Sequence, residues 1–230
     1  MGADPGRLRI AWTATPWNGA DAHPEHAAAT ERTATLLAEM GHHVEEARPS
    51  IDWEPYLRCM TDLWSVSTAA GIDAFAHWLE REPGPDNLEP ATLAMLEYGR
   101  EVTAYATLAA MAHVNVVARQ MGAFFSDWDV LLTPTLGHPQ KEIGAYAKQG
   151  AIAPRDLFAS WSDQESFLPA FNSTGQPAIS LPLHQATSGL PIGMHLVARL
   201  GDEATLIRLA ARLEEALPWA GRTPAIHVGG

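Results

Sequence analysis

The sequence contains one cysteine, two lysines and no long apolar run. With Cys59 alone, an internal disulfide is impossible, which is typical of proteins from reducing compartments. No apolar segment approaches the roughly 20 residues of a membrane-spanning helix, and Met1 to Arg9 lack the pattern of a signal peptide. We therefore expect a cytoplasmic protein without a membrane partner.

The scarcity of positive charge excludes another class of partner. The formal net charge is −12, and Lys141 and Lys148 are the only lysines. Proteins that bind the phosphate backbone of nucleic acids need clustered Lys and Arg side chains. We therefore expect no nucleic-acid partner.

The composition nevertheless supports a large folded core. Hydrophobic residues make up 47% of the 230 positions, and eight of the residues are tryptophan. A chain of this length and composition can bury a core as one unit, so we expect a single α/β domain over residues 1–230.

Histidine pairs raise the question of a metal site. His23 and His26 straddle the predicted start of a helix, whereas His42 and His43 would point to opposite faces of a strand. Neither pair has a neighbouring cysteine or carboxylate cluster that completes a ligand set. We expect no metal and no organic cofactor, and we interpret Cys59 as a packed side chain in preference to a nucleophile.

The first fifty residues predict a strand, a helix and a second strand. Leu8 to Trp12 is a short apolar strand, Pro24 opens a helix that Gly41 ends, and Val44 to Arg48 is the next strand. This order is typical of a βαβ-like unit.

The middle of the chain is mainly helical. Apolar residues at helical spacing predict helices over Glu54–Ala70, Asp73–Arg81, Pro90–Val102 and Thr103–Phe125. A buried strand at Asp129–Thr135 and a long loop at 136–153 follow. Two further helices are predicted over Arg155–Phe167 and Asp202–Leu217.

The stretch from Phe171 to Val197 reads as two strands joined by a turn. Its two apolar runs each follow a Gly-x-Pro step, and a polar break at 184–188 separates them. Together these elements predict an α/β fold with a mixed β-sheet flanked by helices.

No catalytic motif accompanies this fold. The sequence contains no Gly-x-Ser-x-Gly elbow, Ser-x-x-Lys, phosphate-binding glycine loop or His-Glu-x-x-His. The residue chemistry alone therefore singles out no nucleophile and no base.

Several segments of the sequence resemble segments of a known protein family. Asn172-Ser-Thr-Gly-Gln-Pro-Ala-Ile-Ser-Leu-Pro182, followed by Gly189-Leu-Pro-Ile-Gly193, resembles the C-terminal part of amidase signature enzymes. Further segments match in the same order: Leu8-Arg-Ile-Ala, Ala38-Glu-Met-Gly-His-His-Val-Glu-Glu-Ala47, Asp129-Val-Leu-Leu-Thr-Pro-Thr135 and Asp202-Glu-Ala-Thr-Leu. The resemblance covers nearly the whole chain and implies the C-terminal part of an amidase-signature fold.

The resemblance also implies a chemistry. Enzymes of this family hydrolyse amides, or transfer ammonia from them, with a Ser–Ser–Lys triad in their N-terminal half. Neither Lys141 nor Lys148 lies in a matching motif, so no catalytic residue carries over. We expect the C-terminal half of an amidase whose catalytic residues lie outside this chain, and we expect the isolated chain to be inactive.

The same resemblance suggests residues that line a substrate pocket. In the family, the loop before the Gly-Gln-Pro step and the end of the Leu-Thr-Pro-Thr strand lie near the cleft. The predicted substrate-binding residues are Thr135, Asn172, Thr174, Gly175 and Gln176. The alternative is that Gly175 and Pro177 shape the entry to a strand and that Asn172 caps a turn. Trp161 and Phe167 are candidates for apolar pocket walls, with a core position as the alternative.

Three functional hypotheses follow. The first is the amidase half, which acts on a small-molecule amide and pairs with an N-terminal amidase half or with itself. The second is a non-catalytic module with the same fold that binds a ligand or a partner. The third, weaker hypothesis is a fragment of an amidotransferase subunit, for which −12 is a poor charge near RNA.

Overall fold

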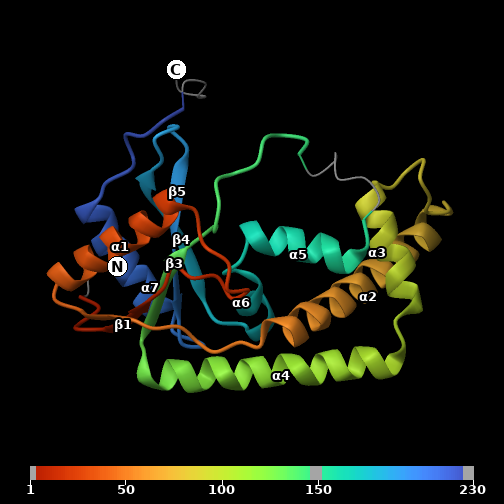
Figure 1. Ribbon diagram of the computed structural model, residues 1–230, viewed down its shortest axis with the longest axis horizontal. Coiled ribbons are helices and arrows are strands. Elements are labelled where there is room, and N and C mark those ends of the chain that lie inside the picture. Colours follow the sequence, from red (N-terminus) through yellow and green to blue (C-terminus); the bar gives the residue numbers. More distant parts are fainter. Residues whose placement is uncertain (1–3, 146–151, 225–230) are drawn as a thin grey trace.

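A five-stranded mixed sheet forms the centre of the computed structural model, which describes residues 4–145 and 152–224 (Figure 1). The strands follow the order β2-β1-β3-β5-β4 across the sheet. Their bounds are β1 Arg9–Trp12, β2 His43–Glu46, β3 Val130–Pro134, β4 Ala178–Gln185 and β5 Pro191–Ala198. The sheet therefore joins the start of the chain to its last third.

The first strand pairs in parallel with both of its neighbours, β2 and β3. Helix α1, Pro24–Glu39, connects β1 to β2. The His23 imidazole accepts a hydrogen bond from the Glu25 amide at the start of this helix (3.4 Å), and Gly41, with φ of 97°, follows its end. The predicted βαβ unit is confirmed.

The last two strands form the predicted hairpin. β4 runs antiparallel to β5, which in turn runs antiparallel to β3. Gly189 turns the chain with φ of 86°, and its amide donates to the Ala186 carbonyl at 2.9 Å. The register shifts between Leu181 and His184, where Pro182 lacks the amide hydrogen that a regular ladder needs.

Helices cover both faces of the sheet. Their bounds are α1 Pro24–Glu39, α2 Trp53–Leu79, α3 Pro90–Glu101, α4 Ala104–Asp127, α5 Pro154–Gln164, α6 Pro169–Thr174 and α7 Glu203–Ala216. Helices α1 and α7 pack on one face, while α6 and the C-terminal part of α4 pack on the other. The structure is therefore an α/β fold with a mixed sheet flanked by helices.

Each face carries its own hydrophobic cluster, because successive strand residues point to opposite sides. On the α1 and α7 side the strands contribute Ile10, Leu132, Leu181, Leu183, Met194 and Leu196. On the α4 and α6 side they contribute Ala11, Leu131 and Val197, against Phe125, Phe167 and Phe171. Phe167 is fully buried, so its alternative as a core residue is confirmed.

Helices α2 to α5 form a lobe beside the sheet (Figure 1). The sequence predicts two helices here, Glu54–Ala70 and Asp73–Arg81, but α2 is one uninterrupted helix. Gly71 lowers intrinsic helix propensity without breaking hydrogen bonds, so the long packing contact with α3 and α4 keeps the helix continuous. Within the described part of the chain, none of the helices is both long and apolar enough to cross a bilayer.

Candidate functional site

Three strands bring polar side chains together on the α4 side of the sheet. Thr135, which directly follows β3, contacts Ser180 of β4 through their hydroxyl oxygens at 2.6 Å. The Thr135 amide donates to the Gly193 carbonyl of β5 at 2.9 Å. The predicted residue Thr135 therefore lies at a junction of β3, β4 and β5.

Gly193 makes room for this hydroxyl pair. A Cβ atom at Gly193 would lie 2.7 Å from the Thr135 hydroxyl oxygen and 2.9 Å from that of Ser180. These separations are shorter than van der Waals contact, so a larger residue would push the two hydroxyl groups apart. The last glycine of the Gly-Leu-Pro-Ile-Gly motif thus has a steric role.

A buried imidazole lies beside the hydroxyl pair. His195 is the cross-strand partner of Ser180 and of Thr133, and its Nδ1 lies 3.3 Å from the Thr133 hydroxyl. That hydroxyl donates its one proton to the Pro134 carbonyl, so it accepts from Nδ1–H of the histidine. Burial lowers the pKa of His195 to about 4, which keeps the ring neutral at physiological pH.

The other four predicted residues lie at the end of α6, a short helix that the sequence does not predict. Asn172 is exposed, and the Thr174 hydroxyl bonds to the Ala170 carbonyl and to the Gln176 side chain. Gly175 ends the helix with φ of 80°. Gly175 thus has a turn-forming position, and a pocket role for these residues stays a prediction.

The five predicted residues form two groups rather than one. Thr135 lies beside Gly193, in the first half of β5, whereas a Cβ atom at Gly175 would lie 3.8 Å from the side chain of Leu200, beyond the end of β5. Both groups border the outer surface of β4, where Ala178 and Ser180 are exposed. An uncovered strip of the sheet therefore separates the two groups.

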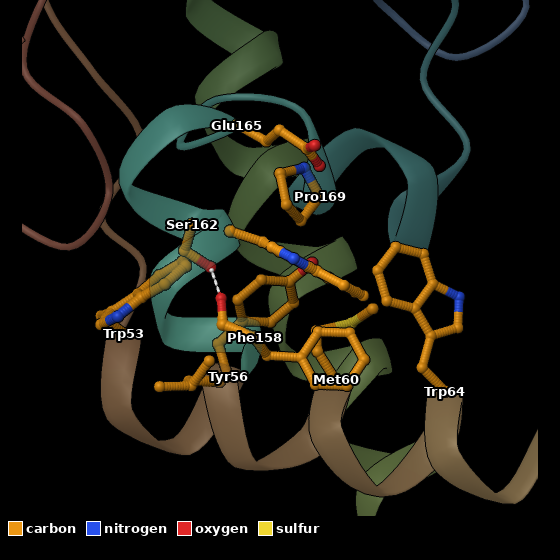
Figure 2. Close-up of a pocket in the computed structure, with 10 residues that line it drawn as sticks. Trp53, Tyr56, Met60, Trp64, Phe158, Ser162, Glu165 and Pro169 are labelled. Carbon is orange, nitrogen blue, oxygen red and sulfur yellow. Dashed lines mark hydrogen bonds between the residues drawn. The ribbon is translucent and has the colours of Figure 1, made fainter. Parts of the chain in front are cut away.

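An aromatic pocket lies between α2 and the α5–α6 segment (Figure 2). It is lined by Trp53, Tyr56, Leu57, Met60, Trp64, Phe158, Trp161, Ser162, Glu165 and Pro169. The centre of a water-sized group can occupy about 20 Å³ of it, so the pocket can hold a small group. The predicted wall residue Trp161 does line a pocket, although not one formed by the five predicted residues.

Hydrogen bonds connect this pocket to α6. The Tyr56 hydroxyl lies 2.8 Å from the Ser173 hydroxyl, which also lies 3.1 Å from the Met60 sulfur. Burial raises the pKa of Tyr56, so its hydroxyl stays protonated. The helical spacing of Trp53, Tyr56, Met60 and Trp64 is the sequence signal that could have indicated this pocket.

The histidines singled out in the sequence have structural contacts. His26 Nδ1 contacts the Leu136 carbonyl at 2.7 Å, and His42 Nδ1 accepts from the Leu8 amide at 3.2 Å. His42 precedes β2, so the expected arrangement of His42 and His43 on opposite faces of one strand is wrong. Within residues 4–145 and 152–224 no three His, Cys, Asp or Glu side chains are placed to hold a metal ion.

Cys59 is packed as expected. It is buried, and its thiol donates to the Ala110 carbonyl at 3.1 Å. Burial, with the nearby Asp62 carboxylate adding to it, raises the pKa of this thiol to about 11. The thiol therefore stays protonated, which makes it a poor nucleophile.

Comparison with known proteins identifies the family. The amidase family model matches residues 2–207. The chain is 34% identical to the 6-aminohexanoate-cyclic-dimer hydrolase of Paenarthrobacter ureafaciens, over 97% of this chain and 47% of that relative. It is 36% identical to the putative amidase AmiC of Mycobacterium bovis, over 93% of this chain and 44% of that relative.

Solved structures agree with the sequence matches. A 6-aminohexanoate cyclic dimer hydrolase structure superimposes with a TM-score of 0.89 at 33% identity, over 97% of this chain and 48% of that chain. A bacterial aryl acylamidase of the amidase signature family, 20% identical, shares the fold with a TM-score of 0.75, over 95% of this chain and 46% of that chain. The chain thus spans about half the length of the curated relatives it matches. By the family match and by its structure, this chain belongs to the amidase family.

Proposed function

We propose that this chain is the C-terminal, pocket-forming part of an amidase that hydrolyses carbon–nitrogen bonds of small-molecule amides. In this proposal the catalytic lysine and two serines lie outside the chain. The observation that carries the proposal is the family match over residues 2–207, in a chain about half as long as its relatives.

The proposed reaction is acyl transfer through a serine. A lysine accepts a proton from a bridging serine, which in turn accepts one from the nucleophilic serine as its oxygen attacks the amide carbon. The amine leaves with a proton, and water then hydrolyses the acyl-enzyme. Backbone amides near the nucleophile stabilise the oxyanion of each tetrahedral intermediate.

The contribution of this chain is a set of polar groups beside that chemistry. The Thr135–Ser180 hydroxyl pair can both donate and accept hydrogen bonds, as an amide substrate requires. Because the catalytic lysine of the proposed triad lies outside the chain, we assign this hydroxyl pair to binding rather than to attack. We assign Thr135, Asn172, Thr174, Gly175 and Gln176 to the substrate side of the cleft.

The uncovered strip on β4 supports a partner. Ala178 and Ser180 share the face that α4 and α6 cover elsewhere in the sheet, yet both are exposed. We propose that an N-terminal amidase half covers this strip and that the isolated chain associates with itself in its absence. We further propose a cytoplasmic location, supported by the single cysteine.

A chimera tests the proposed function. The N-terminal half of the Paenarthrobacter hydrolase is joined to the present chain, and the chimera is assayed against a panel of linear and cyclic aliphatic amides. We expect amide hydrolysis that a serine-directed inhibitor abolishes, and no turnover by the present chain alone. Hydrolysis by the pure isolated chain would show that its catalytic groups do not lie elsewhere.

Two matched variants test the assigned pocket. In the chimera, Thr135→Ala removes the hydroxyl partner of Ser180, and Thr35→Ala removes an exposed hydroxyl on α1. We expect KM to rise about tenfold in the first variant, since one or two hydrogen bonds to the substrate are lost, and to stay unchanged in the second. A chimera that folds cooperatively but hydrolyses no amide would favour the non-catalytic binding module.

A further inference from the structure

The geometry points to a second site on this chain: the aromatic pocket between α2 and α5 binds the ammonium group of a primary alkylamine (Figure 2). Five aromatic residues line it, from both walls: Trp53, Tyr56, Trp64, Phe158 and Trp161. Nothing in the proposed hydrolysis uses these residues. The site can therefore be tested without any catalytic activity.

The ring arrangement suits a cation. Phe158 stacks on Trp64, with centroids 5.3 Å apart and planes at 26°, and meets Trp161 edge-to-face at 5.3 Å. Trp53 and Tyr56 add a tilted pair at 5.9 Å. Aromatic faces attract cations through the ring quadrupole, and tryptophan does so most strongly. Five aromatic side chains thus line one small space.

Glu165 supplies the negative charge. Its side chain lies at the rim of the pocket beside Pro169 (Figure 2). Burial raises the pKa of this carboxyl group, while the positive charge of Lys141 opposes that rise. A half-buried carboxylate in these surroundings would be stabilised by a bound cation with N–H donors.

The size of the pocket restricts the ligand. The centre of a water-sized group can occupy about 20 Å³ of this pocket, so the pocket admits a small head group such as an ammonium and not a long alkyl chain as well. The alkyl chain of a primary amine would extend outward along Trp64, which is 40% exposed. A primary ammonium on an aliphatic chain therefore fits both the charge and the space.

The binding experiment uses the full chain at pH 7.5 and three probes: n-butylammonium, 1-butanol and tetramethylammonium. The eight tryptophan indole N–H signals in a 15N-labelled sample report where each probe binds. We expect saturable shifts of the Trp53, Trp64 and Trp161 signals with n-butylammonium, with a dissociation constant on the order of 1 mM. We expect at least tenfold weaker binding of 1-butanol, which lacks the charge, and of tetramethylammonium, which has no N–H donor for the Glu165 carboxylate.

Three variants identify the groups responsible. Glu165→Gln should weaken n-butylammonium binding about tenfold, whereas Asp156→Asn, which removes an exposed charge from α5, the helix that Glu165 directly follows, should leave it unchanged. Trp64→Leu should weaken n-butylammonium binding about fivefold without affecting 1-butanol. Circular dichroism melts confirm that each variant is folded before its affinity is compared.

Several results would overturn the inference. Equal affinities for n-butylammonium and 1-butanol would show a merely apolar pocket, and unchanged binding in Glu165→Gln would remove the carboxylate from the site. Shifts confined to tryptophans outside the pocket would also contradict it. None of these results bears on amide hydrolysis by the chimera, so the two proposals fail separately.

Discussion

Helices α7 and α4 pack on opposite faces of the same sheet, yet their outer surfaces differ. α7 buries Leu206, Leu209, Ala210 and Leu213, and its outward positions include Glu203, Arg212, Glu214 and Glu215. α4 buries four of its 24 residues, and its outward positions include Tyr105, Leu108, Met111 and Val116. The first pattern is that of a surface helix, whereas α4 exposes these apolar side chains as well as polar ones such as Asn115 and Arg119.

This difference indicates which side of the described structure exposes apolar surface. The α1 and α7 side has a closed core beneath a charged surface. The α4 side carries exposed apolar residues, together with the uncovered strip on β4. Large exposed apolar areas mark interaction surfaces, which agrees with a chain that spans about half of its relatives.

The largest expected effect tests the closed side. Leu209→Ala removes a fully buried side chain beneath α7, while Ile207→Ala changes a side chain that is 48% exposed on the same helix. We expect Leu209→Ala to lower the free energy of unfolding by about 2–5 kcal/mol, because it leaves a cavity, and Ile207→Ala by less than about 1 kcal/mol. Urea denaturation measures both. Equal losses of unfolding free energy in the two variants would mean that Leu209 is no better packed than Ile207.

The next effect tests the interior of the helical lobe. A Cβ atom at Gly99 of α3 would lie 2.0 Å from the Ser65 carbonyl oxygen of α2, whereas one at Gly71 would meet nothing within 4 Å. We expect Gly99→Ala to destabilise the fold by about 3 kcal/mol through this clash. Gly71→Ala should instead stabilise it by up to about 1 kcal/mol, because alanine favours the helix. Thermal melts of the pair distinguish a closely packed lobe from a loose one.

Local patterns in the sequence were sufficient for most of the fold. Pro24 and Gly41 predicted the two ends of α1 closely. The two apolar runs that follow Gly-x-Pro steps form the β4–β5 hairpin. Helix α2 was divided in the prediction because local propensity at Gly71 was weighed without the tertiary contacts that override it. Helix α6 was missed because six residues carry too little periodicity to detect.

The site was harder to predict from the sequence than the fold, for a physical reason. The contact between Thr135 and Ser180 depends on strand register across β3, β5 and β4, which no single segment encodes. The steric role of Gly193 likewise appears only once three strands meet. The resemblance supplied Thr135 as a candidate, whereas Ser180 and His195 required the structure.

The third effect concerns a histidine on the α4 side of the sheet. The neighbouring Leu196 points to the α7 side, but His195 is buried beside Phe171 with a pKa of about 4. Because the unfolded chain protonates its histidine near pH 6.5, stability is lost as the pH falls from about 6.5 towards 4. Between pH 7.5 and 5 this loss is on the order of 2 kcal/mol. In urea titrations His195→Gln should show a drop smaller by that amount, above the background from His184, and an identical drop would refute the assignment.

The smallest expected effect on stability comes from a double variant that tests the α4 surface. Leu108 and Met111 are 66% and 54% exposed, so the double variant Leu108→Glu with Met111→Glu should change the free energy of unfolding by about 0.5 kcal/mol or less. We expect the unmodified chain to self-associate in light scattering because this surface exposes apolar side chains to water, and the double variant to be monomeric because each copy would bring two carboxylates into the contact. The control is Ile207→Glu, which places a charge on the outward side of α7 and should leave the association intact. A monomeric unmodified chain would mean that α4 tolerates an apolar surface in water, and the contrast between the two helices would then carry no information about a partner.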